Sequence, residues 1–291
     1  MTALDAHSPK SGPALSICGG IPDLHHYKGS FGGRIYPLWA DAQAKQSNVR
    51  ADILQTLAKA QGAAVGAEDL VAYIAAVMAH PAFTARFRGD LVRPGLRVPL
   101  TVDKTLFDEA VALGREVVWL HCYGERFVDA AAGRPKRPPR LAKDQAPFIP
   151  ADGAISGAPE PLPETMDYDA AKQRLVIGKG FVENVTPARR AYEISGKTVL
   201  DQWFSYRRRD RTKPLIGDKR PPSPLEKIQP EGWLAEYTED LLNLLYVLGR
   251  LVTLEPRQAD LLERIVAGPF VAVANNDNEQ ESGTTDDKPS Q

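Results

Sequence analysis

The sequence predicts an α+β fold, on three observations taken along the chain. Apolar residues recur at helical spacing through residues 49–123. Short apolar runs separated by glycines follow at 174–194 and are typical of strands. Helical spacing returns at 241–266. Segregated helices and strands favour an α+β domain with a helical N-terminal half, a small β-rich segment with a basic loop, and C-terminal helices packing back.

Composition sets broad limits on the class of protein. The chain has 291 residues, enough for one large domain or two ordinary ones, and its net charge of −1 leaves room only for local basic patches. Two cysteines, Cys18 and Cys122, argue against a disulfide framework and fit the reducing cytoplasm. The N-terminal residues show no secretory pattern, and no run of about 18 apolar residues predicts a membrane span.

The N-terminal half is expected to be mainly helical. Residues 1–20 are small, polar and proline-containing, and are expected to be disordered. The helical part then covers 21–130. Within it we expect a short strand at 34–38, helices at 49–60, 68–79 and 104–123, and a further short helix around Phe83, Phe87 and Leu91.

The C-terminal half mixes loops, strands and helices. Residues 131–165 are rich in proline and glycine and predict a long loop or insertion. Residues 166–274 form the α+β part, and 275–291 are an acidic tail that is expected to be disordered. Inside the α+β part we expect a hairpin of strands 174–177 and 181–185, a third strand at 191–194, a helix that begins at Thr198 with a capping box to Asp201, and two closing helices at 241–252 and 256–266.

Gly196-Lys197-Thr198 resembles the end of a nucleotide-binding loop. The Walker A pattern needs a glycine five positions before this one, and here that position is Ala191. The intervening Tyr192 to Ser195 run is bulky and strand-like, so it cannot wrap backbone N–H groups around phosphates. A strand, a tight turn and a helix start are therefore expected, with no ATP site.

Catalytic and metal-binding patterns are weak throughout the sequence. His25 and His26 are adjacent and point apart on a strand, while His121-Cys122 lies at a predicted helix end. No C-x-x-C or H-x-x-x-H spacing accompanies them, so core histidines are expected and no metal site is predicted. No G-x-S-x-G elbow is present. We expect no catalytic residue and no cofactor.

Two basic clusters are the strongest functional signal from the residues alone. Residues 203–220 carry seven arginines and lysines against two aspartates. A helix dipole explains cations at a helix C-terminus but does not explain seven of them. Because arginine forks bind phosphates and guanine edges, we predict DNA contacts from Arg207, Arg208, Arg209, Arg211 and Lys213, with Arg137 and Arg140 as secondary contacts. A solvated basic surface is the alternative.

Several separate blocks of the chain also resemble one family. DLVAYIAAVMAHPAFTARFRGDLVRPGLRVPL (69–100), FDEAVALGREVVWLH (107–121), YEISGKTVLDQWFSYR (192–207) and LLNLLYVLGRLVTLEPRQADLLERI (241–265) are similar to the C-terminal specificity domain of type ISP restriction–modification enzymes. IPDLHHYKGSFGGRIYPLW (21–39) resembles the segment that joins this domain to the preceding methyltransferase. The resemblance covers roughly residues 21–272 in the same order.

The resemblance implies a target-recognition domain that binds double-stranded DNA and works with a methyltransferase and helicase polypeptide. The chain has no Asn/Asp-Pro-Pro-aromatic methylation motif and no S-adenosylmethionine loop, so it is expected to be non-catalytic. It is then a separate specificity subunit, a split gene product or a relic. Two alternatives remain: a protein-docking module that uses the helical residues 49–123, and a fragment of a catalytic methyltransferase.

Overall fold

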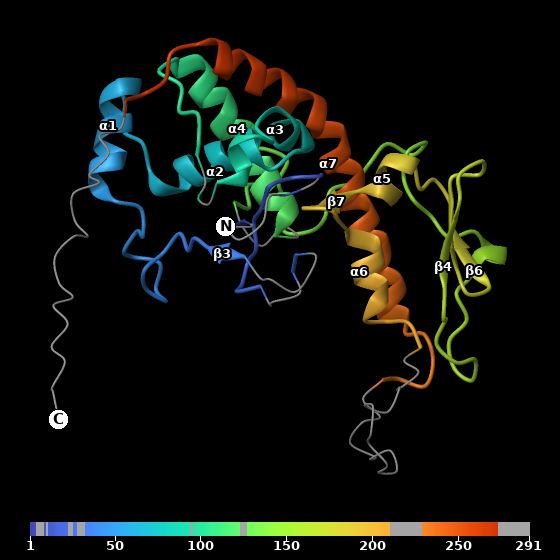
Figure 1. The fold of residues 1–291 in the computed structure, drawn as a ribbon. Helices are drawn as coiled ribbons and strands as arrows, with labels where there is room; N and C mark the ends of the chain where they lie inside the picture. The colour runs from blue at the N-terminus through green and yellow to red at the C-terminus, as the bar shows by residue number, and fades with distance from the viewer. Residues whose placement is uncertain are drawn as a thin grey trace, which may run out of the picture.

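The computed structural model describes residues 1–3, 9, 11–22, 26–27, 33–93, 95, 97–122, 127–209 and 229–272. It confirms the α+β class: a helical body, three small antiparallel sheets and a long C-terminal helix that packs back on the body. In Figure 1 this last helix, α7, runs between the helical body on one side and the largest sheet on the other.

The helical body contains α1 (Ala51–Gln61), α2 (Ala67–Met78), α3 (Pro81–Arg86) and α4 (Lys104–His121). These bounds confirm the three long helices expected at 49–60, 68–79 and 104–123. The short helix expected near Phe83 ends at Arg86, and the 3₁₀ turn Asp90–Val92 follows it. Asp103 begins α4 by accepting a hydrogen bond from the Leu106 N–H at 3.0 Å.

The core of the body is the crossing of α2 and α4. All but two residues of α2 are buried, and its alanines let α4 approach closely. At the crossing a Cβ placed on Gly114 would lie 1.7 Å from the carbonyl oxygen of Ala72. Only glycine fits there, so this residue sets how near the two helices lie.

Two short strands, β1 and β2, lie within residues 1–20, which were expected to be disordered. β1 (Thr2–Ala3) pairs with β2 (Leu15–Ser16) and with β3 (Arg34–Ile35), giving the order β2-β1-β3. Leu15 is fully buried, and the Ile17 N–H donates to His121 Nδ1 at the end of α4. Burial against the helical body, which local composition does not reveal, supplies the stability of these strands.

The largest sheet has the order β4-β5-β6. The predicted hairpin is confirmed as β5 (Arg174–Ile177) and β6 (Gly180–Val182), and an unpredicted strand, β4 (Met166–Asp169), pairs with β5. The third strand expected at 191–194 does not join this sheet. Residues up to Ala191 form the short helix α5 (Pro187–Ala191), and β7 (Glu193–Ile194) pairs instead with β8 (Lys197–Thr198).

Two further expectations about the C-terminal half are wrong. Thr198 precedes α6 (Val199–Ser205) without a side-chain cap, and Asp201, which was expected to complete a capping box, pairs with Arg190 at 2.7 Å. The two expected closing helices are one helix, α7 (Ala235–Ala267), with Pro256 inside it. Proline removes one backbone hydrogen bond, but the leucines on both sides of Pro256 are buried in the same core, and this packing keeps the helix continuous.

Candidate nucleic-acid interface

The Gly-Lys-Thr sequence lies on a tight hairpin between β7 and β8. Ser195 and Gly196 have φ values of 50° and 80°, and Ile194 pairs directly with Lys197 across them. Positive φ at both turn residues is typical of a two-residue hairpin. The Ser195 N–H also donates to the Pro13 carbonyl at 3.1 Å. The expectation of a strand and turn at this position is therefore confirmed, and the turn offers no phosphate-binding loop.

The first basic cluster begins at the end of α6, and its first member is already engaged. Arg207 Nη2 donates to Asp240 Oδ2 of α7 at 2.7 Å, and Nη1 donates to the Trp203 carbonyl at 3.0 Å. Its guanidinium carbon also lies 4.3 Å from the centre of the Trp203 ring and 5.3 Å from that of Tyr237. The structure therefore places Arg207 in a contact between two helices.

Arg208 and Arg209 follow as exposed side chains, and we call these two residues the arginine arm. Arg208 makes no ion pair with any residue that the structure describes, and Arg209 makes a loose one with Glu164 at 3.5 Å. The arm's backbone is fixed, since the Arg209 N–H donates to the Pro163 carbonyl at 2.8 Å. Two other expected contacts, Arg211 and Lys213, lie outside the described residues.

The second basic cluster, which we call the loop cluster, contains Lys136, Arg137 and Arg140. All three are exposed. The segment that carries them borders a groove of about 710 Å³ whose opposite wall is α7, at Glu239, Asn243 and Tyr246. Amide and phenol groups beside exposed arginines can bind both phosphates and base edges.

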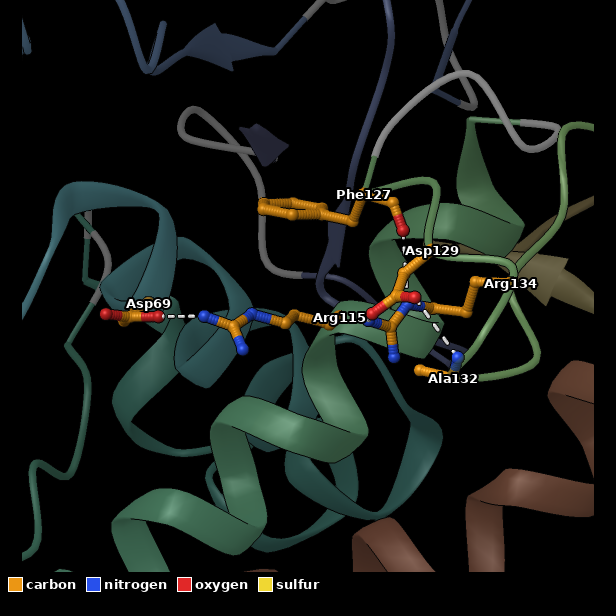
Figure 2. A network of polar contacts seen from close by, with 6 residues as sticks. All are labelled: Asp69, Arg115, Phe127, Asp129, Ala132 and Arg134. Carbon is orange, nitrogen blue, oxygen red and sulfur yellow. Dashed lines mark hydrogen bonds and ion pairs between the residues drawn. The ribbon is translucent and has the colours of Figure 1, made fainter.

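The loop that carries this cluster is tied down at its start. Figure 2 shows the Arg134 side chain against Phe127 and Asp129: Nε donates to the Phe127 carbonyl at 3.1 Å, and Nη2 lies 3.4 Å from Asp129 Oδ2. The Trp119 indole N–H of α4 donates to the Pro135 carbonyl at 2.9 Å. Arg134, although basic and adjacent in sequence, is thus a structural residue, as is Arg115, which pairs with Asp69 in the same view.

Arg189 ties down the other end of this loop. The side chain is buried, and its Nη1 donates to the Gln145 carbonyl at 2.8 Å and the Asn184 carbonyl at 2.9 Å. Burial lowers the pKa of Arg189 from its ordinary value. A Cβ on Gly249 of α7 would lie 2.6 Å from Arg189 Nε, so this guanidinium lies directly on the long helix.

Both clusters therefore meet α7 along its first turns. Asp240 holds the end of α6, and the neighbouring Glu239 lines the groove beside the loop cluster. Local charge in the sequence identified the basic residues. It did not identify Asp240 and Arg189, because Asp240 binds Arg207 from 33 residues away and Arg189 binds the Gln145 carbonyl from 44 residues away.

Two of the histidines that the structure describes make hydrogen bonds within the fold. His121 Nδ1 accepts from the Ile17 N–H at 3.1 Å, and His26 Nε2 lies 2.8 Å from Ser16 Oγ. Among the residues that the structure describes, no three His, Cys, Asp or Glu side chains converge as metal ligands do. His25 is outside them. None of the described helices is long and apolar enough to cross a membrane.

Fold and surface together define a small α+β module that presents basic side chains on two sides of one helix end. The chain belongs to the family of Type ISP C-terminal specificity domains, whose model matches residues 2–244. This agrees with the resemblance found in the sequence. No curated protein matches the chain.

Three solved structures share the fold, and each is similar to 94% of this chain. They are a DrdV–DNA complex (17% identity, TM-score 0.57), the ATP-dependent Type ISP restriction–modification enzyme LlaBIII bound to DNA (14%, 0.54), and a nuclease-deletion mutant of the Type ISP enzyme LlaGI with a DNA substrate mimic (17%, 0.54). The chain spans only 25%, 16% and 21% of their respective lengths.

Proposed function

We propose that this chain is the sequence-specific DNA-binding, target-recognition domain of a type ISP restriction–modification system. The observation that carries the proposal is the family match over residues 2–244. Two exposed basic clusters beside one helix end, and structural neighbours that are described as DNA-bound, support it. The domain is non-catalytic by itself, and an adenine-N6 methyltransferase modifies the site that it selects.

Phosphate contacts supply the affinity and hold the domain in register on the duplex. Arg208 and Arg209 of the arm provide them on one side of α7, and Arg137 and Arg140 of the loop cluster provide them on the other. Arg211 and Lys213 extend the arm in the same sequence. Asn243, on the groove wall between α7 and the loop cluster, is placed for base-edge contact, since its amide can pair with an adenine edge.

The partner polypeptide is the methyltransferase and helicase part of the same system. The similar structures are four to six times longer than this chain, which supports such an arrangement. An apolar groove of about 420 Å³ lies near the N-terminal sheet, with Ile17, Ile35 and Trp39 among its lining residues. It offers a contact surface for that partner. We place the system in the cytoplasm, where it meets DNA.

Duplex binding measured as a function of salt tests this proposal. Fluorescence anisotropy with a labelled 30-base-pair duplex pool, between 50 and 200 mM salt, should show affinity that falls steeply as salt rises. Replacing both Arg208 and Arg209 with alanine should reduce the slope of log K against log[salt] by about 1.8, because each lost phosphate contact removes about 0.9. The Arg137→Ala, Arg140→Ala double variant should act similarly.

Arg264→Ala is the matched control, since it breaks ion pairs with Glu109 and Asp260 at the opposite end of α7. It should leave the slope unchanged. Absence of duplex binding at 50 mM salt, together with tight binding to a methyltransferase, would replace the proposal with a protein-docking function. Calorimetric binding of S-adenosylmethionine would instead support a catalytic fragment.

A further inference from the structure

Arg207 differs from the two arginines that follow it because its charge is already matched. Its guanidinium donates to Asp240 at 2.7 Å and to the Trp203 carbonyl at 3.0 Å, and only 23% of the side chain is exposed. Asp240 accepts a second hydrogen bond from the Trp203 indole N–H at 2.8 Å. One carboxylate on α7 thus binds two side chains, one from the last turn of α6 and one from the turn that follows it.

The aromatic rings close this cluster from both sides. Arg207 lies over Trp203, and Tyr237 of α7 lies on the guanidinium at 5.3 Å. Trp233 contacts both Trp203 and Tyr237 edge-on, with ring centres 6.1 and 5.4 Å apart. To reach a phosphate, Arg207 would have to leave a carboxylate and two rings, while Arg208 is exposed and makes no ion pair with a described residue.

We infer that Arg207 is a positioning residue: with Asp240 and Trp203 it fixes the arginine arm to α7 at a set distance from the loop cluster. The inference rests on the proposed DNA-binding function. The Arg207 and Arg208 N–H groups both donate to the Phe204 carbonyl, so fixing Arg207 also fixes the turn that starts the arm. Glu239, next to Asp240, lines the groove beside Arg137 and Arg140.

This arrangement matters because phosphates on a duplex have a fixed spacing. Two basic clusters contact one DNA site together only if their separation matches that spacing, and a loose arm pays an entropic cost for every contact it makes. Arg207 then contributes to specific affinity without touching DNA. Arg208 and Arg209 contribute through phosphate contacts that depend directly on salt.

Hydrogen–deuterium exchange of the free protein tests the positioning role without DNA. Arg207→Lys keeps the charge but loses the planar fork that bonds Asp240 and stacks on Trp203. It should speed exchange of the Arg207 and Arg208 amides, which both bond the Phe204 carbonyl, at least tenfold, and Asp240→Asn should do so to a smaller extent. Asp201→Asn is the control for Asp240→Asn, because it also removes one carboxylate charge, but from α6, where it breaks the pair with Arg190 and leaves Arg207 untouched. Unchanged exchange in Arg207→Lys would overturn the inference.

Binding to DNA provides the second readout. The probe is the duplex that the wild-type protein enriches from a random-sequence pool. Arg207→Lys should weaken binding to it at least tenfold, whereas a residue whose role is phosphate contact would tolerate lysine. Asp240→Asn should change DNA affinity in opposite directions, depending on whether Arg207 contacts phosphate or positions the arm. Loss of a negative charge near DNA should tighten binding by electrostatics alone, and loss of positioning should weaken it.

The outcomes separate the two proposals. Faster exchange with weaker binding in both variants supports the positioning role. Near wild-type affinity of Arg207→Lys, or tighter binding by Asp240→Asn, overturns it in favour of direct phosphate contact. If the wild-type protein enriches no sequence and binds no duplex, the proposed function fails, and the exchange experiment still decides whether Arg207 fixes the arm.

Discussion

Arg189 and Arg190 are neighbours in the chain and have different roles. Arg189 is buried and bonds two backbone carbonyls beneath α7, whereas Arg190, whose side chain is 22% exposed, forms an ion pair with Asp201, which is 53% exposed. A buried polar group whose partner is removed costs its full desolvation energy, while exposed pairs contribute little. The two positions form a matched pair for separating these effects.

We expect Arg189→Ala to lower the free energy of unfolding by about 3 kcal/mol, because two buried carbonyls lose their donor and a cavity forms beside Gly249. Arg190→Ala should cost about 1 kcal/mol or less. Urea unfolding followed by tryptophan fluorescence measures both. Equal losses in the two variants would show that the buried hydrogen bonds of Arg189 contribute no more than a surface pair.

For single residues, the sequence shows which side chains are charged but not what they contact. Arg207, Arg208 and Arg209 are identical in sequence terms, and only the approach of Asp240 separates the first from the others. Arg134 lies beside the loop cluster in the sequence, yet its side chain is held by Asp129 and Phe127. Because these partners depend on tertiary contacts, a single sequence shows which residues are basic but not which of them are held by other side chains.

Among the elements, the α2–α4 crossing is the contact most sensitive to side-chain size. Gly114→Ala would place a methyl group against the Ala72 backbone, and a backbone oxygen cannot rotate away as a side chain can. The two helices must separate, which should lower the free energy of unfolding by about 3 kcal/mol. Thermal or urea unfolding measures the loss.

Gly89→Ala is the control for this change. Gly89 has a φ of −68°, and nothing lies within 4 Å of a Cβ placed on it. That variant should remain within about 0.5 kcal/mol of the wild type or gain slightly, because alanine restricts the unfolded chain. A Gly114→Ala variant as stable as Gly89→Ala would mean that the helices separate at no cost.

Periodicity predicts elements well where packing agrees with it. Apolar residues at helical spacing predicted the bounds of α2 and α4 nearly to the residue, and the glycines at 178–180 predicted the turn of the β5–β6 hairpin. The failures share a cause: Pro256 suggested a helix end, and Thr198 with Asp201 suggested a cap. In both cases tertiary contacts outweigh the local preference: burial keeps α7 continuous through Pro256, and Asp201 pairs with Arg190.

For the whole molecule, buried titratable groups make stability depend on pH in opposite directions. Burial lowers the pKa of His80 and of His121 to about 4. Both values lie below the ordinary 6.5, so the unfolded chain binds more protons between these limits and stability falls as pH drops below 6.5. Burial raises the pKa of Glu255 to about 7, so its contribution falls as pH rises from 4.5 to 7.

When the pH is lowered from 7.5 to 5, each histidine should lower the free energy of unfolding by about 2 kcal/mol, and Glu255 should raise it by about 2 kcal/mol. Wild-type protein should therefore be about 2 kcal/mol less stable at pH 5. Glu255→Gln removes the opposing contribution, so its loss over the same range should be about 4 kcal/mol. Urea unfolding at both pH values measures this, and equal losses in the two proteins would contradict the role of Glu255.

The long C-terminal helix connects the core to the basic surface. Residues 249–265 of α7 are held by the body, through the Arg250–Glu116 pair, the Gln258 amide on α2 and the Glu263 pair with Arg86. Its first turns, from Tyr237 to Tyr246, hold the arginine arm and face the loop cluster. The two parts belong to one continuous helix (Figure 1).

Because this helix is long, a small tilt at one end produces a large displacement at the other. At 1.5 Å per residue, Asp240 lies about 21 Å along the helix from the buried Leu254. A tilt of about 10° around Leu254 would displace the Asp240 end by about 4 Å, on the order of the ~3.4 Å between successive base pairs. Such a tilt would move the arginine arm, which Asp240 holds, relative to the loop cluster, which Trp119 of α4 holds, by about one base step.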